Sequence, residues 1–247
     1  MKKTFLLFAI LFAVSCTPPK DLTDPQVIVN ESIAFHRLES LGNSKFSLTF
    51  RNLDYTYQNQ NGLYEYTRTQ TDSTGAIIYD VLNNDGLIRY IDGKEAEITE
   101  ERRGAYARSV NSVIYFFRLP YGLNDEAVIK KFKGEKTIKG KTYLEVQVSF
   151  KQEGGGDHFE DVFLYWFDKE DFSMDYMAYL YYTDGGGLRF REAINQRTVS
   201  GHKIQDYINL KPEDEKTDIN NILDLYNAGK LIELSRIINE QVEFNYE

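Results

Sequence analysis

The 247-residue sequence is poor in the residues that usually supply cross-links and metal ligands. It contains one cysteine, Cys16, and three histidines, none of which lies close to another in the sequence. A single thiol cannot form an intramolecular disulfide, so the fold must be stabilised by its hydrophobic core. The histidines, His36, His158 and His202, fall in no helical metal-binding motif. We therefore expect no metal site and no cofactor.

Positive charge and long hydrophobic runs are also scarce. The chain has 29 basic and 38 acidic residues and a net charge of −9, which disfavours binding to nucleic acid or to anionic lipid surfaces. The longest apolar run, residues 5–14, has about half the length needed to span a bilayer. Aromatic residues are abundant instead, with 18 tyrosines and 16 phenylalanines. The apolar content of 42% is sufficient for a folded core.

The first sixteen residues have the pattern of an export signal. Lys2 and Lys3 precede the apolar run, which ends in Ala13-Val14-Ser15-Cys16, and small residues of this kind are typical of a cleavage point. The last four residues resemble a bacterial lipobox, with Ser15 in place of the commoner glycine or alanine. The resemblance implies cleavage after residue 15 and acylation of Cys16. The alternatives are an ordinary secretory signal and an uncleaved N-terminal helix.

We expect the chain to divide into a signal peptide (1–15), a lipidated tether (16–24) and a single domain (25–247). Residues 17–25 hold three of the five prolines, and proline stiffens a linker and disfavours packing. Two or more acyl chains would anchor the protein stably in a membrane, because each buried CH₂ contributes about 0.8 kcal/mol.

Three stretches have apolar residues at helical spacing. They predict helices near residues 25–41, 101–118 and 217–238. The first of these has favourable start signals, since Asp24 can act as the N-cap and Pro25 suits the first helical position.

The segments between these helices alternate apolar and polar residues, as strands with one buried face do. Phe46, Leu48 and Phe50 begin this pattern, and turn sequences such as Asn-Asn-Asp-Gly at 83–86 separate the strands. Such turns recur roughly every 8–14 residues and predict about ten or eleven antiparallel strands. The predicted fold is mainly β (α+β), a curved antiparallel up-and-down sheet or half-barrel with three helices.

Three segments carry a family resemblance: residues 157–168 (DHFEDVFLYWFD), 175–176 (DY) and 184–191 (DGGGLRFR). They resemble an uncharacterised family of Bacteroidetes-type lipoproteins, a domain of unknown function. The overall layout resembles the half-barrel of lipoprotein carriers, the LolA/LolB-like fold, in which a curved sheet wraps over helices and leaves an apolar cavity for acyl chains. The resemblance implies an envelope protein, anchored at the outer membrane, whose ligand is a lipid or another apolar molecule.

Two arginines on one predicted strand form the candidate polar site. Arg189 and Arg191 share a face of that strand, and Tyr179 on the preceding strand lies within reach if the two strands pair. We take Tyr176, Tyr179, Arg189 and Arg191 as candidate ligand-binding residues, which would hold an anionic head group at the mouth of a cavity. The alternative is a cross-strand ion pair on a solvated sheet face, with Asp175 as the carboxylate.

Three functions are compatible with these patterns. The first is a non-enzymatic, membrane-anchored protein that binds a lipid or acyl chain in a cavity under the sheet. The second is an envelope scaffold with a packed core and a protein partner. The third is a hydrolase that uses the region of His158, Glu160 and Asp161. The first is favoured, because no nucleophile motif such as Gly-x-Ser-x-Gly is present. The strand tyrosines suit a cavity lining, although an ordinary core would use them too.

Overall fold

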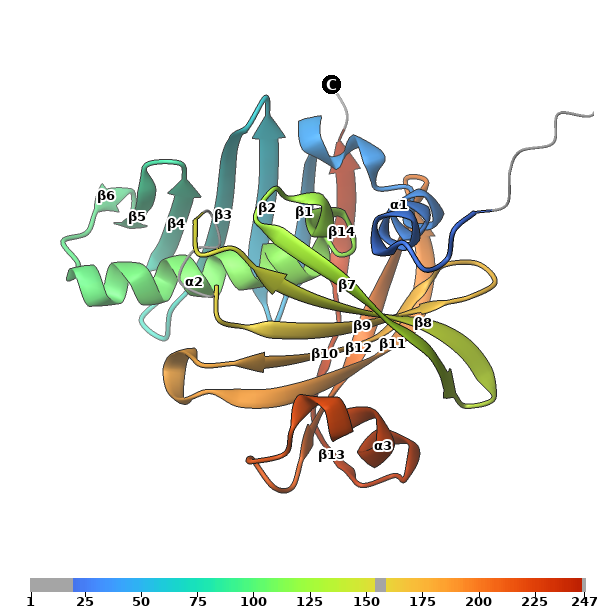
Figure 1. The fold of residues 1–247 in the computed structure, drawn as a ribbon. Coiled ribbons are helices and arrows are strands. Elements are labelled where there is room, and N and C mark those ends of the chain that lie inside the picture. The colour runs from blue at the N-terminus through green and yellow to red at the C-terminus, as the bar shows by residue number, and fades with distance from the viewer. Residues whose placement is uncertain (1–19, 154–158, 246–247) are drawn as a thin grey trace, which may run out of the picture.

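The computed structural model describes residues 20–153 and 159–245 (Figure 1). The predicted signal peptide, Cys16 and most of the predicted tether lie outside these residues, as does His158. Within the described ranges, no helix is both long enough and apolar enough to cross a membrane.

Two antiparallel sheets of seven strands each form the body of the protein. The first sheet has the order β14-β1-β2-β3-β4-β5-β6 and the second the order β13-β12-β11-β10-β9-β8-β7. The strands of the first sheet are β1 (Lys45–Phe50), β2 (Leu53–Gln60), β3 (Leu63–Thr71), β4 (Ile77–Asn83), β5 (Gly86–Ile91), β6 (Lys94–Glu95) and β14 (Glu240–Asn245). Those of the second sheet are β7 (Val128–Ile138), β8 (Lys141–Phe150), β9 (Val162–Asp168), β10 (Met174–Tyr181), β11 (Gly187–Val199), β12 (His202–Pro212) and β13 (Leu231–Ile237). The predicted class, a mainly β protein with a curved antiparallel up-and-down sheet, is confirmed.

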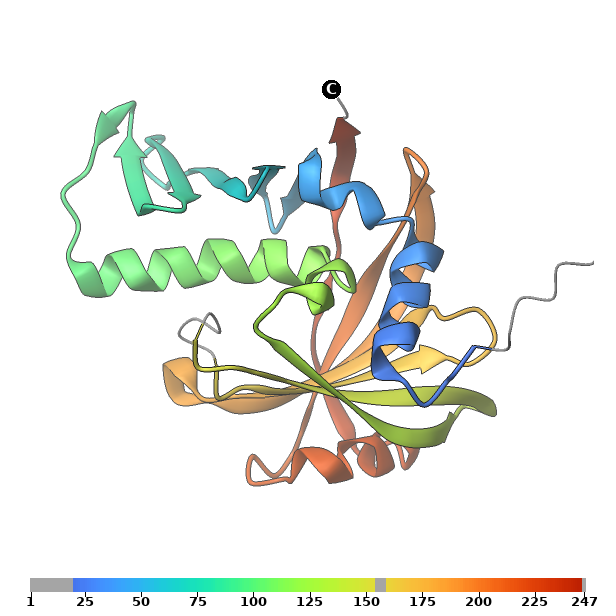
Figure 2. The same cartoon turned by 45° about the horizontal axis from the view of Figure 1, so that its top comes forward.

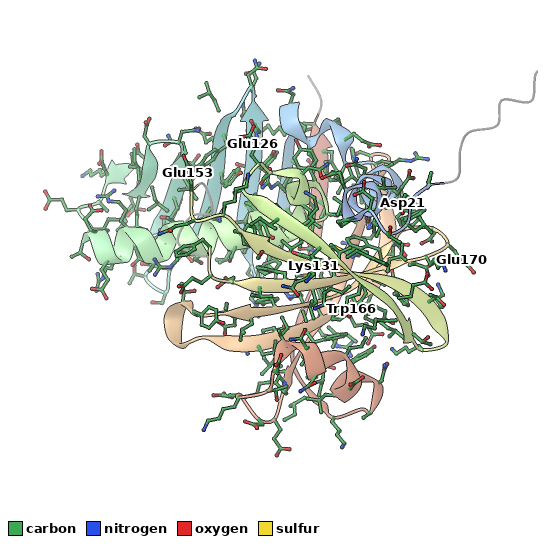
Figure 3. All side chains as sticks on the ribbon, in the orientation of Figure 1. Asp21, Glu126, Lys131, Glu153, Trp166 and Glu170 are labelled. Carbon is green, nitrogen blue, oxygen red and sulfur yellow. The ribbon has the colours of Figure 1, made fainter. Side chains whose placement is uncertain are left out.

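The helices complete a layered arrangement. Helix α2 (Glu100–Phe117) packs on β3, β4 and β5 and runs between the two sheets (Figure 2). Helix α3 (Ile222–Asn227) covers the opposite face of the second sheet, where its apolar side chains meet Trp166 (Figure 3). Helix α1 (Pro25–His36) packs against β7 and β12. Short 3-10 turns are η1 (Glu39–Asn43), η2 (Tyr121–Asn124), η4 (Thr183–Gly185) and η5 (Ile219–Asn221).

The start of α1 follows the predicted capping pattern, but its end does not lie where the sequence suggested. The Asp24 carboxylate accepts a hydrogen bond from the backbone N–H of Gln26 at 2.8 Å, and Pro25 is the first helical residue. The helix ends at His36 rather than near residue 41, because Arg37 adopts a left-handed conformation with φ 57°.

The number of strands exceeds the prediction partly because of a tight turn that has no glycine. Residues 45–60 form two strands, and the chain reverses between them at Arg51 and Asn52, whose φ angles are 53° and 61°. Two consecutive positive φ angles are the mark of a two-residue hairpin turn of the type that matches strand twist. Asparagine adopts this conformation readily, but arginine is not a residue from which a turn is predicted.

The predicted helix over residues 217–238 is wrong beyond Asn227. Gly229, with φ 66°, follows α3, and the chain then forms strand β13, in which Ile237 pairs with Tyr207 of β12. The chain continues into β14, which pairs with β1 in the first sheet. The ladder hydrogen bonds to β12 and β1 therefore override a helical spacing of apolar residues. This terminal segment joins the edges of the two sheets, and it adds two strands to the predicted count.

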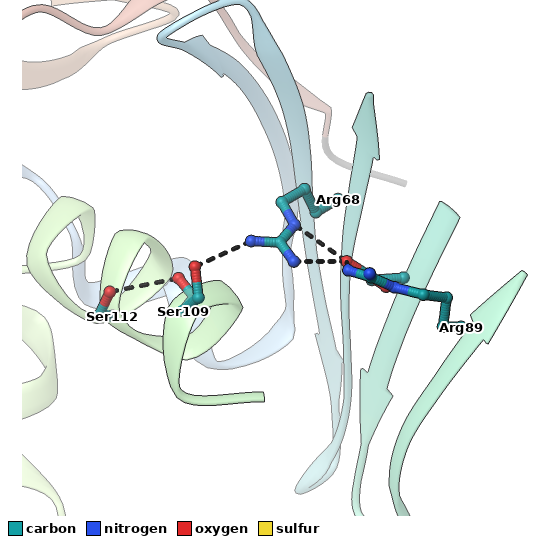
Figure 4. Close-up of polar contacts among 5 residues, drawn as sticks. Arg68, Arg89, Ser109 and Ser112 are labelled. Atoms are coloured by element: carbon teal, nitrogen blue, oxygen red, sulfur yellow. Dashed lines mark hydrogen bonds and ion pairs between the residues drawn. The ribbon is translucent and has the colours of Figure 1, made fainter. Parts of the chain in front are cut away.

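A buried charge network fixes α2 to the first sheet (Figure 4). Asp80 is fully buried and accepts hydrogen bonds from Arg68 (Nε 3.0 Å, Nη2 2.6 Å) and from Arg89 (Nε 2.7 Å, Nη2 2.9 Å). Arg68 also donates from Nη1 to Ser109 Oγ on α2 at 2.8 Å. The guanidinium of Arg89 lies 3.5 Å from the ring centroid of Tyr106, also on α2. One carboxylate thus holds two cations, and both cations touch the helix.

A buried histidine ties α1 to the second sheet. The Nδ1 of His36 lies 3.0 Å from the carbonyl oxygen of Lys203, and its Nε2 accepts from the backbone N–H of Met174 at 3.3 Å. An imidazole that donates from one nitrogen and accepts at the other is neutral. Burial of the ring lowers the pKa of His36 to about 4, because the charged form would lose its hydration.

We expect Asp80→Asn to destabilise the protein by about 3–5 kcal/mol, because it leaves two buried guanidinium groups without a counter-charge. The measurement is the free energy of unfolding in urea. Asp85→Asn is the matched control, since Asp85 is exposed in the turn between β4 and β5 and its loss should change stability by less than about 0.5 kcal/mol. Equal effects of the two substitutions would contradict a central role for Asp80.

Stability should fall as the pH drops from 7 to 5, in part because of His36. In this range the unfolded chain takes up a proton on its histidine near pH 6.5, whereas the folded protein, with a pKa of about 4, does not. The wild type should therefore lose about 2 kcal/mol more than a His36→Asn variant between pH 7 and pH 5. Urea unfolding of both proteins at the two pH values checks this, and parallel losses would show that His36 is not the group responsible.

Candidate functional site

A cavity of about 740 Å³ lies between α2 and the second sheet. It is bordered by side chains of α2, by strands β8 to β13 and by residues of β1, β3 and β4 of the first sheet. Its apolar lining is mostly aromatic and includes Val113, Phe116, Phe117, Phe150, Phe163 and Ile237. Volumes of this size are typical of sites that enclose a small organic molecule.

The cavity lies beside a helix that is fixed to the first sheet and also meets the second sheet through Tyr115 and Phe116. The contacts of α2 through Ser109 and Tyr106 fasten it to the first sheet, and small residues, Ala105 and Ala107, lie among the positions that border the cavity. Alanine side chains are too short to fill the space between α2 and the second sheet. Space therefore remains beside these short side chains, although Tyr115 and Phe116 of the same helix reach the second sheet.

Alternation along β10 and β11 decides which candidate residues reach the cavity. Tyr179 and Arg191 line it, and they lie on strands that pair directly, with Tyr179 opposite Arg189. Arg189 is on the same face but is not among the cavity-lining residues, and it donates from Nη2 to the hydroxyl of Tyr181 at 2.8 Å. Tyr176 faces the other side of the sheet, where its ring contacts Tyr226 at 5.5 Å. The structure thus groups two of the four candidates at the cavity.

Arg191 is the most unusual residue of the site. It is only 7% exposed, and its guanidinium carbon lies 3.8 Å from the ring centroid of Phe116 on α2. Its Nη2 donates to the hydroxyl of Tyr179 at 3.0 Å, while its Nε is buried without an acceptor. Within residues 20–153 and 159–245, no carboxylate lies within ion-pair distance of it. The cross-strand ion pair considered from the sequence is therefore not formed: Asp175 instead accepts from the hydroxyl of Tyr143 at 2.9 Å.

A neutral tyrosine lies beside this arginine on the cavity wall. Tyr207 of β12 is buried, and its ring centroid is 6.0 Å from the guanidinium carbon of Arg191. Burial raises the pKa of Tyr207 to about 12, and Gln205 donates to its hydroxyl at 2.9 Å. The hydroxyl of Tyr207 therefore stays protonated and neutral at neutral pH. Tyr207 thus supplies no negative charge to pair with Arg191.

Two polar residues of the cavity carried no signal in the sequence, and a third, Asp161, was considered there only for the hydrolase alternative. Arg51, Arg108 and Asp161 line the cavity. The opposite wall of the cavity comes, for each of them, from segments that are far away along the chain. Asp161 is buried and accepts from the backbone N–H of Tyr182 at 3.3 Å. The sequence did offer one signal, because polar residues interrupt the apolar stripe of α2. A helix covered on both sides needs few polar residues, so these positions indicate a polar part of the cavity wall.

The residues of the hydrolase alternative do not form a cluster in the part of the chain that the structure describes. Glu160 is exposed in a turn before β9, and Asp161 points to the cavity, while His158 lies outside the described residues. His202 is buried, with its Nδ1 against the carbonyl oxygen of Arg37 and its ring 4.2 Å from that of Phe244. Among the described side chains, no three His, Cys, Asp or Glu residues gather where they could hold a metal ion.

Comparison with solved structures identifies the fold. A LolA superfamily protein from Nitrosomonas europaea has a TM-score of 0.50 and 9% sequence identity, over 90% of this chain and 94% of that one. A protein of the DUF1329 family from Desulfovibrio piger has a TM-score of 0.48 and 10% identity, over 90% and 94%. A putative outer membrane lipoprotein-sorting protein domain from Vibrio parahaemolyticus has a TM-score of 0.46 and 7% identity, over 91% and 94%. The expected resemblance to the lipoprotein-carrier fold is confirmed at the level of architecture.

The sequence itself points to a family without an assigned activity. No curated protein matches the chain. A model of a family of unknown function does match, over residues 2–239, which is nearly the whole sequence. The chain therefore belongs to this family, DUF6503.

Proposed function

We propose that this protein is a non-enzymatic envelope lipoprotein that binds a hydrophobic ligand, such as a lipid or acyl chain, between α2 and the second sheet. The observation that carries the proposal is the cavity of about 740 Å³ with its aromatic and aliphatic lining. Burial of apolar ligand surface in such a space is favourable by about 25 cal/mol per Å². A scaffold with a packed core would have no use for this volume.

The proposed location depends on the N-terminal residues. The lipobox-like end of the export signal supports acylation of Cys16, and the residues after it, including Pro18 and Pro19, would form the tether between the acyl chains and the domain 25–247. The resemblance to lipoprotein carriers supports the outer membrane as the destination. A tethered domain of this kind holds its cavity close to a source of lipid.

Filling the cavity should remove the ligand without unfolding the protein. Val113 of α2 lines the cavity and is partly buried, so Val113→Trp places an indole in the space that a ligand would occupy. We expect the full chain, purified in a mild detergent, to release about one lipid per molecule on organic extraction. The Val113→Trp variant should release at least about fivefold less.

The control for this experiment is Arg102→Trp, which adds the same side chain at an exposed position of α2 that does not line the cavity. Detergent-borne lipid is the same in all three preparations, and acyl groups on Cys16 stay with the protein because they are covalently bound. Lipid quantified by mass spectrometry that is equal in all three would refute the proposed function.

Acylation of Cys16 has its own test. Cells that express the protein should incorporate labelled palmitate into the wild type and into Ser15→Ala, which restores the commoner lipobox residue. Cys16→Ser should abolish the label, because Cys16 is the single thiol of the chain. Label retained in Cys16→Ser would show that the acyl group is attached to a residue other than Cys16.

A further inference from the structure

Arg191 is a buried cation that has no anionic partner among residues 20–153 and 159–245. It is more than nine-tenths buried, and its described contacts are the rings of Phe116, Tyr179 and Tyr207 together with one hydrogen bond to a neutral hydroxyl. Aromatic faces attract a cation, but they do not replace the acceptors that a guanidinium loses when it leaves water. A guanidinium has five N–H donors, and in the described part of the chain neither Nε nor Nη1 has an acceptor.

The contacts around Arg191 do not indicate that its charge stabilises the fold. Glu192, its neighbour on β11, points to the opposite face, where it bonds Lys139 and the hydroxyl of Tyr226. Buried arginines that stabilise the fold of this protein are paired with a carboxylate, as Arg68 and Arg89 are with Asp80. A lone buried cation at the wall of a cavity is better explained by a partner that arrives with the ligand.

The charge of the whole cavity points the same way. Its described lining includes three arginines, Arg51, Arg108 and Arg191, against one carboxylate, Asp161. The chain as a whole carries a net charge of −9. A positive interior in an acidic protein attracts anions to the cavity, because a low-dielectric cleft concentrates the field of the charges that line it.

We infer that the ligand is an anionic amphiphile, an apolar chain with a carboxylate or phosphate head, and that Arg191 binds the head while the aromatic lining binds the chain. This inference rests on the proposed function and names the class of lipid. The free Nη1 and Nε donors offer a carboxylate or phosphate oxygen charge-assisted hydrogen bonds. Phe116 and Tyr179 hold the guanidinium plane in place, and Tyr179 keeps its Nη2 oriented.

The test compares three probes that share one acyl chain and differ in the head: oleate, oleoyl lysophosphatidic acid and 1-monooleoylglycerol. Native mass spectrometry of the full chain, released from a non-ionic detergent at pH 8, gives the bound fraction of each probe. The wild type should bind both anionic probes at least about tenfold more tightly than the neutral one, as expected for one charge-assisted contact. The tighter of the two anions identifies the head as carboxylate or phosphate.

Three variants assign the effect to Arg191. Arg191→Met keeps the length of the side chain but removes the charge, and it should weaken both anionic probes at least about tenfold and the neutral probe less than about threefold. Arg191→Lys keeps the charge and should recover most of the preference for anions. Arg189→Met is the matched control, because Arg189 lies on the same strand face but does not itself line the cavity and donates to the hydroxyl of Tyr181, and it should bind all three probes as the wild type does.

Stability supplies a second readout. Without ligand, Arg191→Met should have a melting temperature equal to or above that of the wild type, because replacing an unpaired buried charge by an apolar side chain removes a desolvation cost. A lower melting temperature together with equal loss of all three probes would mean that Arg191 is structural, and would overturn the inference. Equal binding of anionic and neutral probes by the wild type would overturn it too, while leaving the proposed function intact. Failure of all three probes to bind would overturn both.

Discussion

The arrangement of this protein depends on one buried carboxylate. Asp80 pairs with both Arg68 and Arg89, and both arginines reach α2, so the helix is fixed to the first sheet along one side. An ion network without solvent has strict geometric requirements, because every charge must keep its partner. The helix then meets the second sheet only where Tyr115 and Phe116 reach it, and the cavity lies beside these contacts.

The two sheets that enclose the cavity are held together by the last strands of the chain. β13 pairs with β12 and β14 pairs with β1, so residues far apart in the sequence become neighbours in one curved surface. Phe244 of β14 packs on Phe46 and Phe117, with ring centroids 5.7 Å and 6.3 Å away. The end of the chain thus closes the core between β1 and α2, and the half-barrel is complete only when these long-range pairs have formed.

Sequence patterns predicted the local features of this fold well. Asp24 caps the helix it precedes, and alternation places Tyr179, Arg189 and Arg191 on one face of their sheet. The same alternation assigns Tyr176 to the opposite face, beside Tyr226, which is why the four candidates do not form one group. The segment after Asn227 is not determined by its local pattern, since its apolar spacing suits a helix and only pairing with β12 makes it a strand.

The sequence alone determined the class of the fold, the positions of most turns, the single thiol of the chain and the faces of β10 and β11, because these depend on residues within a few positions of one another. Only the tertiary structure decided that a cavity exists, that Arg191 lies in its wall and that no carboxylate of the described residues pairs with this arginine. Those properties depend on distances between α2, β11 and β12, which are set by packing and by the Asp80 network. Whether a buried charge has a partner depends on how all the neighbouring elements pack around it.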